Sequence, residues 1–291
     1  MLRLSLRRRR QLLPYLILGP GLLWLIVFFL VPLANQAYVS LQSGDPELGY
    51  TFTWEWHVYT DALSDYREQI VRSLGYAGIA TIADLIIAFP LAYFIAFKAG
   101  RFKNLLLLLI ILPFFTSYLV RTVSWQLILS DSGWVAERFR DVGLLGDDGR
   151  LLATPFAVIA GITYNFLPFM ALPLYVSLEK IDRRLIEAAT DLYANRLTAF
   201  RKVTLPLALP GIFAGSLLTF IPAVGDFINA ALLGTPNEYM IGNVIQSKFL
   251  NVLDYPTAAA LSFLLMALIL VGIALYARVL GTRSLTEAAR T

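Results

Sequence analysis

The chain has 291 residues, of which 58% are apolar and only 15% are charged, and it contains no cysteine. With a mean hydropathy of +0.67 it is too apolar for a soluble domain of this length. The lack of cysteine excludes disulfides and Cys-ligated zinc or iron–sulfur centres. The formal charge of +4 does not indicate a nucleic-acid partner, because the basic residues cluster at the ends of apolar segments and report membrane orientation instead.

Six apolar runs of about 20 residues or more, the length that crosses a bilayer, predict six membrane-spanning helices. The runs are 14–34, 70–97, 103–129, 153–178, 207–234 and 257–280. The first run follows a basic stretch, as in a signal peptide, but it is too long and no small-residue cleavage site follows, so we expect a retained helix. The sequence therefore predicts an all-α membrane protein with one transmembrane domain over 1–291.

Basic residues set the predicted orientation. Most of the 24 lysines and arginines lie before the first run, between the second and third runs, between the fourth and fifth runs, and after the last run. The positive-inside rule then places both termini and the segment 179–206 in the cytoplasm. The loop 35–69 falls outside, where its acidic and aromatic residues suit a surface resting at the outer headgroups or, alternatively, contact with a receptor.

Polar groups inside the predicted spans are costly and usually face the bundle interior or a water-filled path. Asp84 lies near the middle of the second span, where it is either a solute ligand or the partner of a neighbouring side chain. Asn165, in the fourth span, is expected to form a hydrogen bond between helices.

Two further charges lie within the third and fifth spans. Tyr118, Arg121 and Trp125 follow an i, i+3, i+7 pattern and so share one helix face. An aromatic face can hold an alkylammonium by cation–π attraction, although an unpaired Arg121 would repel a polycation. Asp226 follows Pro222, which is expected to kink its helix, and helical rise places it at a depth similar to that of Arg121. The two charges either pair for packing or line a solute path.

The segment 179–206 is the only large insertion between apolar runs on the predicted cytoplasmic side, and it is charged. The stretches 182–190 and 197–203 each predict a short helix with one charged and one apolar face. Glu187 offers a carboxylate to a basic partner, and the two alanines after it allow close approach of another backbone. The apolar residues suited to fill a groove on that partner are Leu192, Leu197 and Phe200. The alternative is an amphipathic loop that lies on the headgroups.

The same segment carries Glu187-Ala188-Ala189, then Tyr193, and then Val203, Leu205 and Pro206. This spacing resembles the EAA signature of the membrane subunits of ABC importers, in which Gly stands where this chain has Tyr193. Further similarity to the first permease subunit of the spermidine/putrescine importers is carried by LPFFTSYLVRTVSW at 112–125, YNFLPFMALPLYVSLEKID at 164–182, LPLALPGIFAGSLLTFIPAVGDFINAALLG at 205–234 and IGNVIQSKFL at 241–250. The chain looks like a permease of the type I ABC importer fold.

The resemblance implies a complex of two six-helix permeases, the second a related chain, with two cytoplasmic ABC ATPases and an external solute-binding protein, in a bacterial cytoplasmic membrane. It implies alternating access, with a polyamine as the expected solute and the segment 179–206 transmitting ATP-driven motion. The residues expected to couple to the ATPase are Glu187, Ala188, Ala189, Asp191, Leu192, Tyr193 and Phe200. The residues expected along the path are Asp84, Tyr118, Arg121, Trp125, Asn165 and Asp226.

The chain itself contains no G-x-x-x-x-G-K-[ST] motif for binding ATP, and its one histidine, His57, falls in a predicted loop. We therefore expect no cofactor, metal or enzymatic activity of this chain, with ATP and magnesium bound by the partner ATPase. Two alternatives stay open: an ion-coupled secondary transporter, which would need no ATPase, and an ABC importer of another small organic solute.

Overall fold

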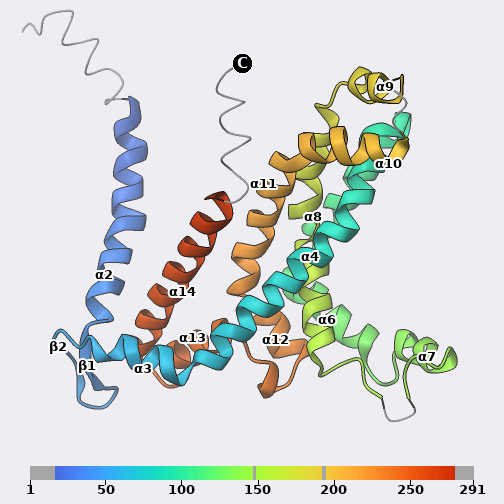
Figure 1. Cartoon of the computed structure of the whole chain (residues 1–291). Coiled ribbons are helices and arrows are strands. Elements are labelled where there is room, and N and C mark those ends of the chain that lie inside the picture. The colour runs from blue at the N-terminus through green and yellow to red at the C-terminus, as the bar shows by residue number, and fades with distance from the viewer. Residues whose placement is uncertain (1–16, 147–148, 192–194, 279–291) are drawn as a thin grey trace, which may run out of the picture. The chain divides into compact units, whose positions relative to one another are not determined.

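The computed structural model describes residues 17–146, 149–191 and 195–278 (Figure 1). Within these residues, five helices are long and apolar enough to cross a membrane: Ile17–Val39, Arg67–Phe97, Pro155–Glu179, Arg196–Val224 and Tyr255–Tyr276. A sixth candidate is the helix pair Gly100–Phe115 and Tyr118–Asp141, which together are long and apolar enough but are bent by 95°. The helical class is confirmed, and the five to six candidate spans agree with the predicted number.

Across the described ranges, the elements follow one another along the chain with one short hairpin among the helices. They are the π-helical turn η1 (Ile26–Leu30), α2 (Val31–Val39), β1 (Gln42–Asp45), β2 (Gly49–Phe52), α3 (His57–Asp65), α4 (Arg67–Phe97), η2 (Gly100–Phe102), α5 (Lys103–Ile111), η3 (Leu112–Phe115), α6 (Tyr118–Leu129), α7 (Trp134–Asp141), α8 (Pro155–Glu179), α9 (Arg183–Asp191), α10 (Arg196–Ala199), the π-helical turn η4 (Phe200–Thr204), α11 (Leu205–Val224), α12 (Ile228–Leu233), η5 (Pro236–Glu238), α13 (Ile241–Leu250) and α14 (Tyr255–Tyr276).

The chain divides into two units, Met1–Ser64 with Ser247–Leu264, and Asp65–Gln246 with Leu265–Thr291. The first unit holds the antiparallel pair β1 and β2, whose register runs from Gln42 opposite Phe52 to Asp45 opposite Gly49. The turn of this hairpin is closed by Asp45, whose carboxylate accepts hydrogen bonds from the backbone N–H groups of Glu47 and Leu48 at 2.9 and 2.7 Å. The second unit holds both of the larger apolar clusters.

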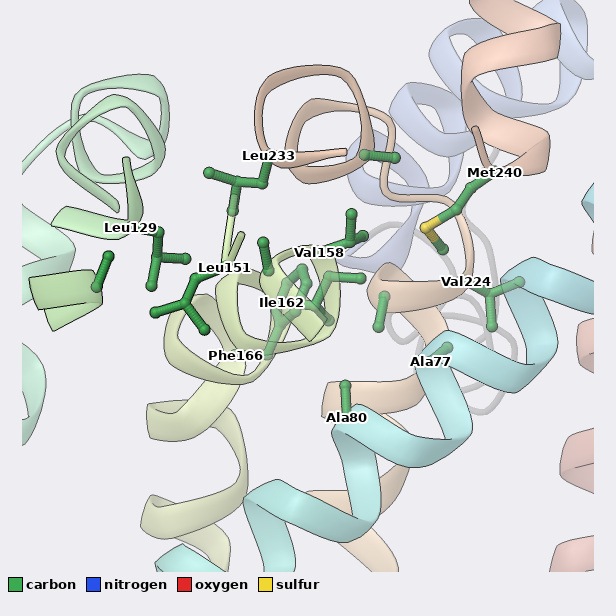
Figure 2. Close-up of a cluster of buried hydrophobic side chains, with 14 residues drawn as sticks. Ala77, Ala80, Leu129, Leu151, Val158, Ile162, Phe166, Val224, Leu233 and Met240 are labelled. Atoms are coloured by element: carbon green, nitrogen blue, oxygen red, sulfur yellow. The ribbon is translucent and has the colours of Figure 1, made fainter. Parts of the chain in front are cut away.

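The core of the second unit is built around α8, which packs against both α4 and α11. In Figure 2, Val158 and Ile162 of α8 lie between Ala77 and Ala80 of α4 on one side and Leu129 of α6 on the other. The alanines of α4 recur at helical spacing, so this helix presents a face of small side chains to α8. Small residues let helices approach closely in a membrane, where packing drives association.

Two glycines bring α11 equally close to α8. A Cβ added at Gly211 would lie 2.5 Å from the Cβ of Ser177, and one added at Gly215 would lie 2.8 Å from the sulfur of Met170. The G-x-x-x-G pattern of this helix therefore serves close packing between the two helices.

The structure corrects the predicted span 103–129, which is not one helix. α5 is followed by the 3-10 turn η3, and the backbone at Thr116 and Ser117 is extended before α6 begins at Tyr118. Pro113 lies at the start of η3, and its carbonyl accepts a hydrogen bond from the hydroxyl of Thr116 at 2.7 Å. Proline lacks the N–H that continues the ladder of helical hydrogen bonds, and at the break the hydroxyl of Thr116 joins its backbone N–H in donating to the carbonyl of Pro113.

The predicted span 207–234 and short helix 197–203 are wrong in their bounds. α10, η4 and α11 form one helix, Arg196–Val224, so the second half of the charged insertion is the beginning of a membrane-spanning helix. This helix ends two residues after Pro222, and α12 starts a separate segment at Ile228. Asp226 therefore lies in a break between two helices, and its depth cannot be obtained by counting helical rise.

Candidate functional site

The break between α11 and α12 is organised around the carboxylate of Asp226, a side chain that is only 6% exposed. One carboxylate oxygen accepts the backbone N–H of Asn229 at 2.8 Å. The other accepts the side-chain amide of Asn229, also at 2.8 Å, and the hydroxyl of Tyr118 from α6. The buried carboxylate thus has several donors, as a buried charge requires.

The hydrogen-bond network continues from Asn229 into two other helices. The amide of Asn229 also donates to the hydroxyl of Tyr118 at 2.6 Å, and its oxygen lies 3.4 Å from the hydroxyl of Thr122 on α6. Asn165 of α8 donates to Thr122 and to the oxygen of Asn229, both at 3.3 Å. The prediction that Asn165 forms hydrogen bonds between helices is confirmed. This network joins α6, α8 and the broken helix at one point.

Close backbone approaches hold the break in place. A Cβ added at Gly161 of α8 would lie 2.6 Å from the side-chain oxygen of Asn229, and one added at Gly242 of α13 would lie 2.4 Å from the carbonyl oxygen of Gly225. Asn243 donates from its amide to the carbonyl of Phe227 at 2.7 Å. α8 and α13 therefore confine the break from two directions.

A cavity of 230 Å³ opens at this break. Its lining combines aromatic and apolar side chains with one carboxylate: Tyr118, Phe166, Pro222, Gly225, Asp226, Phe227 and Ile228. Aromatic faces attract cations, and a carboxylate does so more strongly. The arrangement is suited to an organic cation and unsuited to an anion.

Arg121 does not pair with Asp226, and the hypothesis of a packing pair between them is wrong. Among the described residues no ion pair joins them; the guanidinium instead lies 5.0 Å from the ring centre of Phe114 and 5.5 Å from that of Tyr118. Arg121 is 8% exposed, and its Nε and Nη1 atoms have no hydrogen-bond partner among these residues. Tyr118 is thus in contact with both charges, through its hydroxyl and through its ring face.

The other predicted path residues lie away from this cavity. Trp125 packs on the core cluster, with its ring centre 5.3 Å from that of Tyr164. Asp84 is fully buried on the face of α4 that carries small side chains. Neither of its carboxylate oxygens has a hydrogen-bond partner among the described residues. The structure therefore brings Tyr118, Asn165 and Asp226 together and leaves Asp84 outside the network.

The predicted coupling segment begins with α9, whose charged residues are exposed. Glu187, Ala188 and Asp191 are exposed on this helix, Ala189 is half-buried, and the predicted residues Leu192 and Tyr193 lie outside the described residues. Arg183 attaches the start of α9 to the end of α4, because its guanidinium donates to the carbonyl of Ala96 at 3.2 Å and lies 5.8 Å from the ring centre of Phe97.

Phe200 has a different role from the exposed residues of α9. Its ring centre lies 5.6 Å from that of Phe89 and 6.3 Å from that of Tyr93, both on α4. It fixes the start of the helix 196–224 against α4 instead of presenting a free surface. Beside it, a cleft of 440 Å³ is lined by residues that include Glu187, Lys98 and Arg196.

Sequence reasoning missed Asn229, Thr122, Gly161 and Gly242. Asn229 stands three residues after Asp226 within the string GDFIN, which is the spacing of an acidic cap at a helix start, and this signal was available. The two glycines carry no local signal, because they are required by helices distant in sequence.

Comparisons with known proteins agree with this architecture. Residues 88–281 match the family described as binding-protein-dependent transport system inner membrane component. The spermidine/putrescine transport system permease protein PotB of Haemophilus influenzae is 41% identical over 251 residues, which cover 85% of this chain and 88% of that protein. The inner membrane ABC transporter permease protein YdcU of Escherichia coli is 34% identical over 281 residues, which cover 89% of this chain and 86% of that protein.

The fold is also that of a solved importer. The chain superposes on a chain of the bacterial alginate ABC transporter, crystallised in complex with alginate pentasaccharide-bound periplasmic protein, with a TM-score of 0.66 and 19% identity, covering 98% of this chain and 99% of that one. The protein belongs to the family of inner membrane components of binding-protein-dependent transport systems. It is a multi-pass permease subunit of an ABC importer in a bacterial inner membrane.

Proposed function

We propose that this permease forms half of the translocation path for a polyamine such as spermidine or putrescine. Several relatives at about 40% identity are named as permeases of spermidine/putrescine transport systems. The observation that carries the proposal is the Asp226 carboxylate in the wall of a 230 Å³ cavity whose other lining is largely aromatic and apolar. A carboxylate and aromatic faces together bind an alkylammonium group, whereas they repel anions and offer few hydrogen bonds to sugars.

The hydrogen-bond donors around Asp226 determine how tightly the proposed site binds a cation. Tyr118 and Asn229 hold the carboxylate by hydrogen bonds in the absence of solute, so an ammonium group that approaches exchanges partners with them. Arg121 lies behind the ring of Tyr118 and opposes tight binding of a polycation. Such a weak site suits a path, because a solute that passes through must also leave.

We further propose that α9 docks into a cytoplasmic ATPase that binds ATP and magnesium, with both termini of the permease in the cytoplasm. Support comes from the exposed Glu187 on α9 and from the attachment of α9 to α4 through Arg183. A push on α9 would then be transmitted to α4 and, through Phe200, to the helix that ends at the Asp226 break. A second, related permease and an external solute-binding protein complete the proposed complex, which works by alternating access.

The test is reconstitution of the permease with its ATPase, second permease and binding protein in proteoliposomes. We expect uptake of radiolabelled spermidine or putrescine that requires ATP inside the compartment to which α9 faces. Uptake of another small organic solute in place of both polyamines would overturn the solute assignment. Uptake driven by an ion gradient without ATP would overturn the ABC mechanism.

A further inference from the structure

A row of five aromatic side chains runs along the first unit, and we call it the aromatic ladder: Tyr38, Phe52, Trp54, Trp56 and Tyr59. Successive ring centres lie 4.7, 4.9, 6.2 and 6.1 Å apart, and the first pair is stacked. The ladder extends from the end of α2 across β2 to α3. It plays no part in the network around Asp226.

The ladder lies where two membrane spans end. The helix Ile17–Val39 ends one residue after Tyr38, and α14 begins at Tyr255. The hairpin that carries Phe52 is attached to the start of α14, because the hydroxyl of Tyr50 donates to the carbonyl of Leu253 at 2.8 Å and the rings of Tyr50 and Tyr255 lie 5.8 Å apart. The ends of two bilayer-spanning helices mark one membrane boundary, so the hairpin between them lies at the level of the headgroups.

The side chains of the two tryptophans of the ladder are exposed on the surface. Trp54 is 62% exposed and Trp56 is 60% exposed. Trp54 also has a positive φ of 56°, a left-handed conformation that is unfavourable for a bulky residue. The ring contacts of Trp54 with Phe52 and Trp56 leave most of its indole exposed, and a strained residue that exposes a large apolar ring indicates that an external surface receives the ring.

We propose that the aromatic ladder is a membrane anchor that binds the headgroup region of zwitterionic lipid and fixes the hairpin at the bilayer surface. Indole and phenol rings combine an apolar body with a polar edge, so they partition to this region. The segment 41–66 contains five acidic residues and no lysine or arginine. That charge disfavours anionic headgroups, whereas the ammonium of phosphatidylethanolamine is attracted both by the carboxylates and by the ring faces.

The test uses the natural absence of cysteine in this chain. A nitroxide is attached at Thr53→Cys, which leaves both indoles in place, in the complete importer reconstituted in phosphatidylethanolamine vesicles with a minor share of phosphatidylglycerol. Reference labels are placed at Phe28→Cys, within the first span, and at Asp141→Cys, exposed at the end of α7. Collision rates with oxygen and with a water-soluble nickel complex then give the depth of each label.

We expect the label at position 53 to lie between the two references, at headgroup depth, and to stay there when the solute-binding protein is added. Accessibility to nickel equal to that of position 141, lost only when the binding protein docks, would overturn the proposal in favour of a protein contact. A depth equal to that of position 28 would overturn it as well.

A variant pair then tests the rings themselves. Trp54→Ala combined with Trp56→Ala should raise the nickel accessibility of the label by about twofold, whereas the matched Phe pair should change it less, because Phe keeps the ring area. Unchanged accessibility in the alanine pair would contradict anchoring by the indoles. If the alanine pair does not assemble, the label beside the natural indoles still decides the question.

Discussion

Asp226→Asn keeps the shape of the side chain and removes its charge. In the structure the two carboxylate oxygens accept two hydrogen bonds from Asn229, each at 2.8 Å, and one from Tyr118. The side-chain amide of the variant keeps an oxygen as acceptor for the backbone N–H of Asn229. In place of the second oxygen it presents an NH₂ group to two donors, the side-chain amide of Asn229 and the hydroxyl of Tyr118. Hydrogen bonds to charged groups contribute about 1.5–3 kcal/mol each. Since a neutral amide costs less to bury, we expect a net loss of about 2 kcal/mol in the stability of the complex.

The same substitution should reduce transport by more than its effect on stability explains. Two unit charges about 4 Å apart attract by roughly 4 kcal/mol at an effective dielectric constant of about 20. If half of this attraction is offset by desolvation, uptake of a polyamine at subsaturating concentration falls by more than about tenfold. The assay is the initial rate of uptake per assembled complex in proteoliposomes, with the affinity of the binding protein measured separately as a control that should not change.

Asp84→Asn is the matched control for stability. It makes the same chemical change in the same helical bundle, but neither oxygen of Asp84 has a hydrogen-bond partner among the described residues. Its thermal stability should therefore equal or exceed that of the natural chain. Wild-type uptake by an assembled Asp226→Asn complex would refute the role of the carboxylate in the path, and equal stability of the two variants would refute the hydrogen-bond account.

Three other outcomes are expected. Glu187→Lys should abolish most ATP-dependent uptake and loosen co-purification of the ATPase, and normal coupled ATPase activity in this variant would contradict docking through α9. Gly242→Ala places a Cβ 2.4 Å from a backbone carbonyl and should cost about 1–3 kcal/mol, whereas Gly272→Ala, with nothing within 4 Å, should be neutral or stabilising in a melting experiment. Burial raises the pKa of Asp254, but hydrogen bonds, led by that from Lys248, outweigh it and leave the pKa below its usual value. The hydrogen-bonded carboxylate of Asp254 should therefore contribute about 0.5–1 kcal/mol to the free energy of unfolding above pH ~4, and this contribution should vanish as the pH falls below that value. Asp254→Asn should accordingly lower the melting temperature at neutral pH but not in acid.

Several features of the fold could be predicted because they depend on local sequence. The spans follow from the bilayer, which requires about 20 apolar residues for each crossing helix. The charged insertion was recognisable because Glu187 and its neighbours interrupt apolar sequence with amphipathic spacing, and α9 forms where the spacing predicts it. Tyr118 and Arg121 were identified from their positions on one helix face, and in the structure the guanidinium of Arg121 lies 5.5 Å from the ring centre of Tyr118.

The tertiary structure alone decided where the helices break and which polar groups meet there. Pro113 and Pro222 lie inside apolar runs long enough for a continuous span, and a kink at Pro222 could be predicted, yet the chain ends a helix near each of them. At the breaks a side-chain hydroxyl and a side chain from a neighbouring helix add hydrogen bonds to the backbone carbonyls. The partnership of Asp226 with Tyr118 and the exclusion of Arg121 likewise depend on a bend of 95° between helices. Hydropathy and periodicity describe one helix at a time, whereas a buried polar group acquires its partner only when several helices have packed together.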